Sequence, residues 1–252
     1  MQRTSSAVGC FRLAWQAERD NVPQVLIEQV LAALVNSAEE EALTAAIQLA
    51  YFYFFDKKKP RSCDEALVFR LLSADEFFRQ ELGTMTEPYW HLVAEGFRER
   101  FPGRDLELLG ALLSRPEHLW RTRVSRGPGY MADAIVRAHP DQAWSIVSHL
   151  LESDEAQSIV SWLGDEFGWE ARARAGAITD FDLDVVMAWV LQNPGTRARK
   201  LSCCLPKTLD EKDGGRLTRL FLEAFGDDEE VSDFLIAYFL AGSWMGPENA
   251  HP

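Results

Sequence analysis

The chain has 252 residues, of which 47% are hydrophobic and 26% are charged, a balance typical of a folded protein and not of a disordered one. Its net charge of −13 disfavours binding to nucleic acid, because a phosphate backbone repels an acidic surface, and suits a basic protein partner. Four cysteines without a Cys-x-x-Cys pair argue against a disulfide framework. They favour a reducing compartment, for which the cytoplasm is the default.

Two apolar stretches near the start of the chain are too short to cross a membrane. Residues Ala7–Trp15 are interrupted by Arg12 and lack a cleavage site, so they do not form a signal peptide. The run Tyr51–Phe55 is shorter still. We therefore expect no membrane association, and we expect residues 1–20 to form a weakly ordered N-terminus.

Helical periodicity predicts an N-terminal helical half over residues 21–120. The first helix follows Pro23, and its apolar face is expected to consist of Val25, Ile27, Val30, Leu31 and Leu34. A second helix is expected over Glu39–Phe55, closed by Lys57–Lys59, whose charges complement the helix dipole. We prefer this interpretation of the lysines to nuclear import or anion binding. Further helices are expected over Asp64–Gly83 (with Leu67, Leu71 and Leu72 buried), Tyr89–Phe101 after Pro88, and Asp105–Ser114.

Residues 121–252 show a more regular pattern after a loop or boundary at Arg121–Gly129. Apolar helices alternate with short turns rich in Asp, Gly, Pro or Ser, and three units resemble one another, with second helices that begin near Asp154, Thr196 and Asp228. Their mean spacing of about 37 residues is close to that of HEAT and armadillo repeats. The expected helices are Tyr130–Ala138, Asp141–Leu151, Asp154–Phe167, Asp182–Gln192, Thr196–Leu205, Gly215–Phe225 and Asp228–Leu240.

Strand signals are nearly absent, so these elements predict an all-α fold. We predict a HEAT-like α-solenoid of antiparallel helix pairs, because a single pair of this kind cannot bury its apolar face alone. An irregular compact helical bundle is the alternative.

No sequence motif identifies a reaction. Asp180, Asp182 and Asp184 begin like a calcium loop, but Val185 and Leu191 stand where that loop needs Gly and Glu, so we interpret them as a helix N-terminus. The five histidines lack the spacing of a zinc site, and no P-loop or dinucleotide fingerprint occurs. Gly242–Gly246 is not a nucleophile elbow, because Ser243 holds the second position and not the third. We therefore assign no catalytic residue, cofactor or metal ligand.

Basic residues form two groups that we take as a candidate interaction surface. Arg197 and Lys200 are expected to share one helix face, although a solvated helix face is the alternative. The other group consists of Arg121, Arg123 and Arg126.

The C-terminal residues Gly242, Ser243, Trp244, Gly246 and Pro247 predict a cap that folds back on the last helix pair. Together with Phe225-Gly-Asp and Val231, this ending resembles the last helical repeats of large bacterial NTPase-type proteins of antiviral defence, over roughly the last 70 residues. The resemblance implies a recognition or scaffold region. It implies no catalytic residue, and the chain lacks the NTPase motifs.

These observations predict a non-enzymatic protein–protein interaction module, which the resemblance would place in bacterial defence. One alternative is an immunity protein that neutralises a basic toxin by charge complementarity. A second alternative is an enzyme with a dispersed site, for which the nearest titratable residues are His139, Asp141, His149 and Glu152. The sequence sets neither the partner nor the oligomeric state.

Overall fold

The protein is all-helical, as the sequence predicts. The structure, a computed structural model, describes residues 3–37, 39–74, 77, 86–114, 119, 127–153, 156–164, 177–206, 215–229, 231–233 and 235–236. These ranges contain helices and turns and no strand. Within them, no helix combines the length and the apolar character that a membrane span requires. The chain divides into two compact units, Met1–Ala132 and Asp133–Pro252.

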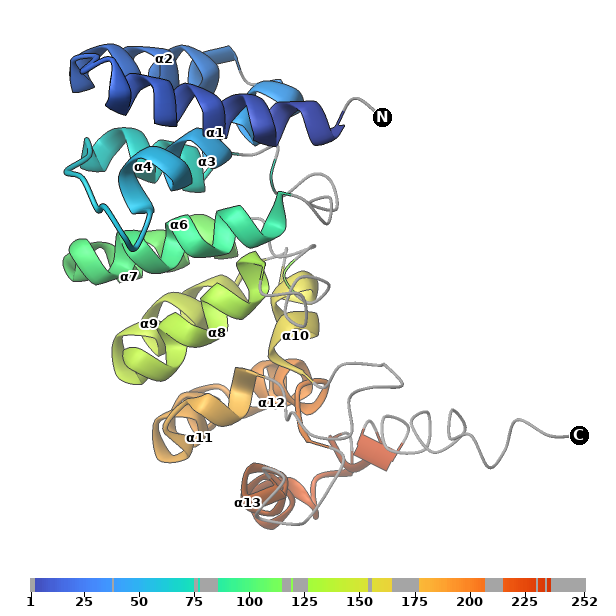
Figure 1. Ribbon diagram of the computed structural model, residues 1–252. Coiled ribbons are helices and arrows are strands. Elements are labelled where there is room, and N and C mark those ends of the chain that lie inside the picture. Colours follow the sequence, from blue (N-terminus) through green and yellow to red (C-terminus); the bar gives the residue numbers. More distant parts are fainter. Residues whose placement is uncertain are drawn as a thin grey trace, which may run out of the picture. The chain divides into compact units, whose positions relative to one another are not determined.

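Figure 1 shows the helices of unit 1 following one another in chain order, with α1 and α2 at one edge and α6 and α7 at the other. Both α1 and α2 pack against α3, and α6 packs against α3 and α4. The helices are α1 (Arg3–Arg19), α2 (Gln24–Ser37), α3 (Glu40–Ala50), α4 (Glu65–Leu72), α6 (Glu87–Arg100) and α7 (Asp105–Leu113). A 3₁₀ turn, η2 (Pro102–Arg104), joins α6 to α7, and α8 (Pro128–Ala138) begins in this unit.

The N-terminus is helical from Arg3 onward, where the sequence predicts weak order. Helix α1 packs against α3, and its Ala14 and Ala17 are buried. Intrinsic propensity by itself stabilises a single helix little, so a helix such as α1 depends on packing against its neighbours. Tertiary packing on α3 supplies what the local sequence lacks.

A π-helical turn, η1 (Tyr51–Phe55), continues α3 to the predicted end of the second helix. Tyr53, Phe54 and Phe55 are all buried, although successive residues of a helix point in different directions. They are buried together because η1 contacts both α1 and α6. Lys57–Lys59 follow directly and are exposed.

Two predictions for unit 1 are wrong in detail. Only Ile27 and Leu31 of the expected face of α2 are buried, whereas Val25 and Val30 are 54% and 41% exposed. Helix α4 ends at Leu72 and not near Gly83, a residue outside the described part of the chain. Its start is as predicted, because the Asp64 carboxylate accepts a hydrogen bond from the Leu67 amide at 3.1 Å. The predicted burial of Leu67, Leu71 and Leu72 is confirmed.

Unit 2 continues from the last turns of α8. Its helices are α9 (Pro140–Leu151), α10 (Ala156–Leu163), α11 (Leu183–Gln192), α12 (Pro194–Ser202) and α13 (Gly215–Phe225), with a 3₁₀ turn η4 (Ala177–Asp180) before α11. Figure 1 shows α11 beside α12, and both α9 and α13 contact α11. The core contains Trp162 and Phe221, which are fully buried.

The ends of two helices in unit 2 differ from prediction. Helix α12 stops at Ser202, so Cys203 and Cys204 lie in a turn and not in the helix. Helix α10 ends at Leu163, and the expected continuation to Phe167 lies outside the described residues. The expected helix from Asp228 begins as predicted, since the Asp228 carboxylate accepts from the Val231 amide at 3.1 Å.

Three helix junctions share one backbone conformation before a proline. Phe101, His139 and Asn193 have φ between −128° and −148° and ψ between 54° and 70°. Each closes one helix and precedes a proline at the start of the next helical segment: Pro102, Pro140 and Pro194. The carbonyls of His139 and Asn193 accept the first bond of the new helix from Ala143 and Arg197 at 2.9 and 3.0 Å. The same local chemistry therefore produces a sharp corner between consecutive helices at three places.

Candidate interaction surface

Arg197 is bound within unit 2 and is not part of a free basic surface. Its guanidinium lies 4.6 Å from the centre of the Trp189 ring and donates to the Trp189 carbonyl at 2.6 Å. The same group pairs with the Glu152 carboxylate at 2.6 Å. Only 16% of the Arg197 side chain remains exposed. Arg197 therefore connects the start of α12 to the ends of α9 and α11.

Lys200 contacts the same region one helical turn later. Its ammonium donates to the Leu151 carbonyl, in the last turn of α9, at 2.5 Å. Carbonyls at a helix C-terminus lack intrahelical partners and carry partial negative charge, so a cation there stabilises α9. Arg197 and Lys200 lie close together as predicted, but both side chains make contacts within unit 2. The sequence suggested a ligand-binding ridge or a solvated helix face, and it predicted neither of these internal contacts.

Other predicted interaction residues lie outside the described part of the chain. These are Arg121, Arg123 and Arg126, and the predicted cap at Gly242, Ser243, Trp244, Gly246 and Pro247.

Asp180 and Asp182 precede α11, and Asp184 lies in its first turn. The Asp182 carboxylate caps α11 by accepting from the Asp184 amide at 2.9 Å, which confirms the interpretation as a helix N-terminus. The Asp180 carboxylate lies 3.3 Å from the Arg137 guanidinium. Among the described residues, no three His, Cys, Asp or Glu side chains are grouped as metal ligands.

The outer side of α11 combines acidic and apolar residues. Asp184, Val185, Ala188 and Leu191 are exposed, and their spacing of three to four residues places them along one face. Val185 is 40% and Leu191 is 58% exposed, whereas Val186 and Val190 are fully buried on the opposite side. We refer to Asp182, Asp184, Val185, Ala188 and Leu191 as the α11 face. It offers carboxylates at the start of the helix and apolar side chains further along it.

Most of the net charge of the protein belongs to unit 2. Unit 1 has 16 Lys and Arg against 18 Asp and Glu, a net charge of −2, whereas unit 2 has 10 against 21, a net charge of −11. Exposed carboxylates of unit 2 include Asp141, Asp227, Glu229 and Asp233 besides those of the α11 face. Arg137, Arg197 and Lys200 are engaged in the contacts described above. A basic partner is therefore attracted to unit 2 much more strongly than to unit 1.

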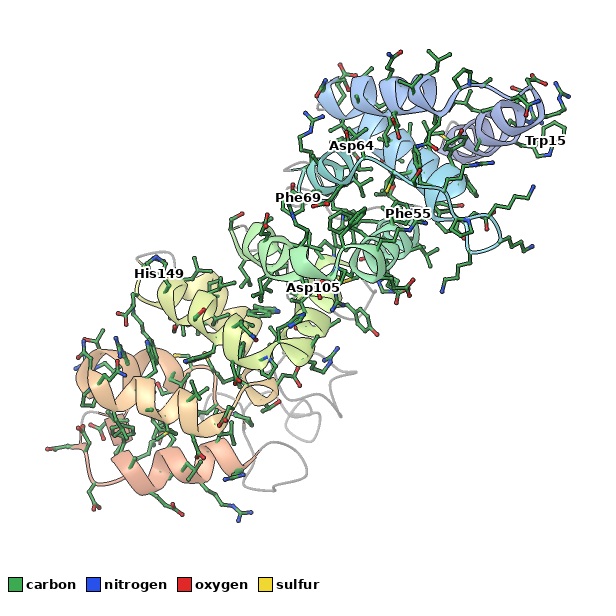
Figure 2. All side chains as sticks on the ribbon, turned by 90° about the vertical axis from the view of Figure 1, so that its left-hand side faces the viewer. Trp15, Phe55, Asp64, Phe69, Asp105 and His149 are labelled. Atoms are coloured by element: carbon green, nitrogen blue, oxygen red, sulfur yellow. The ribbon has the colours of Figure 1, made fainter. Side chains whose placement is uncertain are left out.

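The titratable residues of the dispersed-site hypothesis lie at the two ends of α9. His139 precedes the helix and Asp141 is in its first turn, whereas His149 is in its last turn and Glu152 follows it. These ends are roughly 15 Å apart for a helix of this length. Figure 2 shows the His149 side chain at the surface of unit 2, and Glu152 is bound to Arg197. The four residues do not converge on one point.

Three of the four cysteines have a thiol whose pKa is raised by burial. Burial raises the pKa of the Cys204 thiol well above its usual value, and neighbouring Cys203 adds to this effect. Burial also raises the pKa of the Cys63 and Cys203 thiols. A raised pKa keeps a thiol protonated near neutral pH, where the thiolate would be the reactive form.

Comparison with known proteins gives no match: no family model, curated protein or solved structure is similar to the chain.

Proposed function

We propose that the protein is a non-enzymatic interaction module of HEAT-like helix pairs that binds a basic segment of another protein on the α11 face. The observation that carries this proposal is the composition of that face. Val185 and Leu191 are large apolar residues exposed to solvent, and Asp182 and Asp184 lie at the start of the same helix. An amphipathic helix with apolar residues at helical spacing and Lys or Arg beside them is complementary to it.

The negative charge of unit 2 would favour basic partners over others and would speed their association. The −11 charge of unit 2 attracts a basic protein over a distance set by ionic strength. Burial of Val185 and Leu191 then stabilises the complex in a way that salt does not screen. We therefore expect binding that weakens with salt but is not abolished by it.

The repeated corners support the stacked-pair architecture in this proposal. The corners at Phe101, His139 and Asn193 share one backbone conformation, as expected for units that arose from one pattern. Stacked helix pairs typically present extended surfaces for protein recognition. The four-cysteine chain would work in a reducing compartment such as the cytoplasm, and the C-terminal resemblance would place its role in bacterial defence.

A second candidate function is favoured by the same charge distribution. An immunity protein holds a toxin inactive by covering its functional surface, and toxins that act on nucleic acid are basic. The acidic unit 2 fits that role. Co-expression distinguishes it: the protein should restore the growth of cells that express a basic protein encoded beside it, and failure to do so leaves only the general binding function.

The test of the main proposal is affinity purification of the full chain at low and high salt. Wild type is compared with a variant of the α11 face, Asp184→Lys with Leu191→Glu. A matched control, Glu223→Lys with Leu222→Glu, makes the same two changes on the exposed side of α13. We expect a stoichiometric partner with wild type and the control, and its loss with the α11 variant. A partner that the α11 variant retains would contradict the proposal.

A further inference from the structure

Helix α2 has two stripes of uncharged residues on different sides. The inner stripe consists of Ile27 and Leu31, which are buried, and half-buried Leu34, and α2 packs against α3. The outer stripe consists of Leu26, Val30, Ala33 and Ser37, all of which are exposed. Residues in the outer stripe follow one another at intervals of four, three and four. This spacing places them in one line along the helix and is the spacing by which helices pack on one another.

No exposed residue of α2 is charged, although the Arg70 guanidinium of α4 donates to the Asn36 side chain at 3.3 Å. Its exposed residues are Val25, Leu26, Gln29, Val30, Ala33, Asn36 and Ser37. Glu28 is the one charged residue in the sequence of α2, and it is half-buried, with its carboxylate 2.7 Å from the Gln24 amide nitrogen. An exposed helix of a globular domain normally has charged residues on its outer side. A helix without them is typical of a position between two packed layers.

We propose that the outer stripe of α2 binds the same stripe of a second copy of this chain, with the two helices antiparallel about a twofold axis. Charge selects this occupant over a basic protein. Two copies that each carry a net charge of −13 repel one another wherever their carboxylates meet. The exposed side of α2 has no carboxylate, and α2 belongs to the unit with a net charge of only −2. A basic partner would gain no electrostatic attraction on this face.

The order of side-chain sizes along the stripe favours the antiparallel orientation. Leu26 and Val30 lie in the N-terminal half and the smaller Ala33 and Ser37 in the C-terminal half. In an antiparallel pair centred between Val30 and Ala33, each Val30 faces an Ala33 and each Leu26 faces a Ser37. Large side chains then fill the space left by small ones. A parallel pair would place Leu against Leu and leave a gap at Ser37.

The size of the contact sets its strength. A helix of 14 residues is roughly 21 Å long, and its outer side covers less than the ~800 Å² that each partner contributes to a standard stable interface. We therefore expect a reversible dimer with a dissociation constant on the order of 10–100 μM.

Sedimentation equilibrium of the full chain, from about 1 to about 300 μM, tests the proposal. Wild type should change from monomer to dimer across this range, and raising the salt should leave the association unchanged or strengthen it, because apolar burial resists screening. Val30→Glu alone and Ala33→Lys alone should each weaken dimerisation at least tenfold. An equimolar mixture of the two variants should restore it as a heterodimer, because the carboxylate introduced in one copy then faces the ammonium introduced in the other. This mixture also excludes misfolding as the reason for the loss.

Leu191→Glu is the matched control, since it places a charge at another exposed apolar site, on the α11 face. Leu191→Glu should leave the dimer intact. The same substitution is part of the α11 variant that should lose the partner of the proposed function. The dimer and the binding of that partner can therefore be disproved independently of one another. Three results would overturn the inference: a monomer at every concentration, with or without another protein bound at α2; a dimer that Val30→Glu does not weaken; or variants that are helical by circular dichroism but do not associate when mixed.

Discussion

Both units of the protein close a helix C-terminus with a cation, but with different consequences for their surfaces. In unit 1, the Arg100 guanidinium lies 4.3 Å from the centre of the Phe55 ring and donates to the Phe54 carbonyl at 2.6 Å. In unit 2, Arg197 likewise contacts a ring and a carbonyl, both of Trp189. Unit 1 balances its charges at −2, whereas unit 2 has about half as many cations as carboxylates.

This comparison shows why cationic clusters in a helical sequence are poor guides to binding sites. An arginine that covers an aromatic ring and satisfies a carbonyl contributes to the fold, so it is not available to an external anion. In unit 2 carboxylates outnumber cations by 21 to 10.

The largest effect is expected for Arg100→Ala. The substitution removes hydrogen bonds to the carbonyls of Phe54 and Arg61 and uncovers the Phe55 ring, so the free energy of unfolding should fall by about 3 kcal/mol. Urea denaturation measures the loss, and hydrogen exchange should locate it in unit 1. Lys58→Ala, at an exposed position, should change stability by less than ~0.5 kcal/mol. A loss below ~1 kcal/mol for Arg100→Ala would show that the contacts at η1 contribute little.

Arg197→Ala should cost about 2 kcal/mol, less than Arg100→Ala, because the Glu152 carboxylate that it leaves is exposed and can be hydrated. Hydrogen exchange should increase at the ends of α9 and α11 in unit 2. The exposed Arg216 of α13 provides the control substitution, Arg216→Ala. If the exchange rates of unit 2 are the same in both variants, the connection between α12, α9 and α11 is not structural.

Trp162→Phe should destabilise unit 2 by ~1–2 kcal/mol. The indole Nε1 donates to the Asp133 carboxylate at 3.0 Å in a buried setting, and phenylalanine keeps most of the apolar volume without that donor. The exposed Trp15 allows a matched change, Trp15→Phe, which should have little effect in thermal unfolding. Equal effects of the two substitutions would show that the buried hydrogen bond to Asp133 contributes little to stability.

Removal of an N-cap should have the smallest effect in each unit. Asp64→Ala and Asp182→Ala each remove one carboxylate–amide bond, to Leu67 and to Asp184, and should cost ~1 kcal/mol. Asn at either position should restore most of the stability, because its side-chain oxygen also accepts from the amide. Urea denaturation of these four variants, and of the two corresponding Glu variants as a control for side-chain length, measures this. If the Asn variant at either position is as unstable as the Ala variant, the aspartate stabilises the helix through its charge and not through the hydrogen bond.

Helix boundaries were predicted well where local chemistry determines them. Helix α13 covers Gly215–Phe225 as expected, and the breaks at Pro102, Pro140 and Pro194 are in place. Proline and capping carboxylates act within one turn, so a single sequence contains all the information that is needed. Boundaries without such a signal were predicted less well, as the ends of α4 and α12 show.

The sequence by itself determined the helical class, most of the helix starts and the acidic balance, because these follow from side chains a few residues apart and from composition. Only the tertiary structure decided which side of α2 is covered and where Arg197 and Lys200 point. An apolar residue such as Val30 is buried only if another helix lies against it, and helical spacing cannot say which side that is. Lys200 binds the carbonyl of Leu151, far away in the sequence, and a contact of that kind exists only after α9 and α12 have packed together.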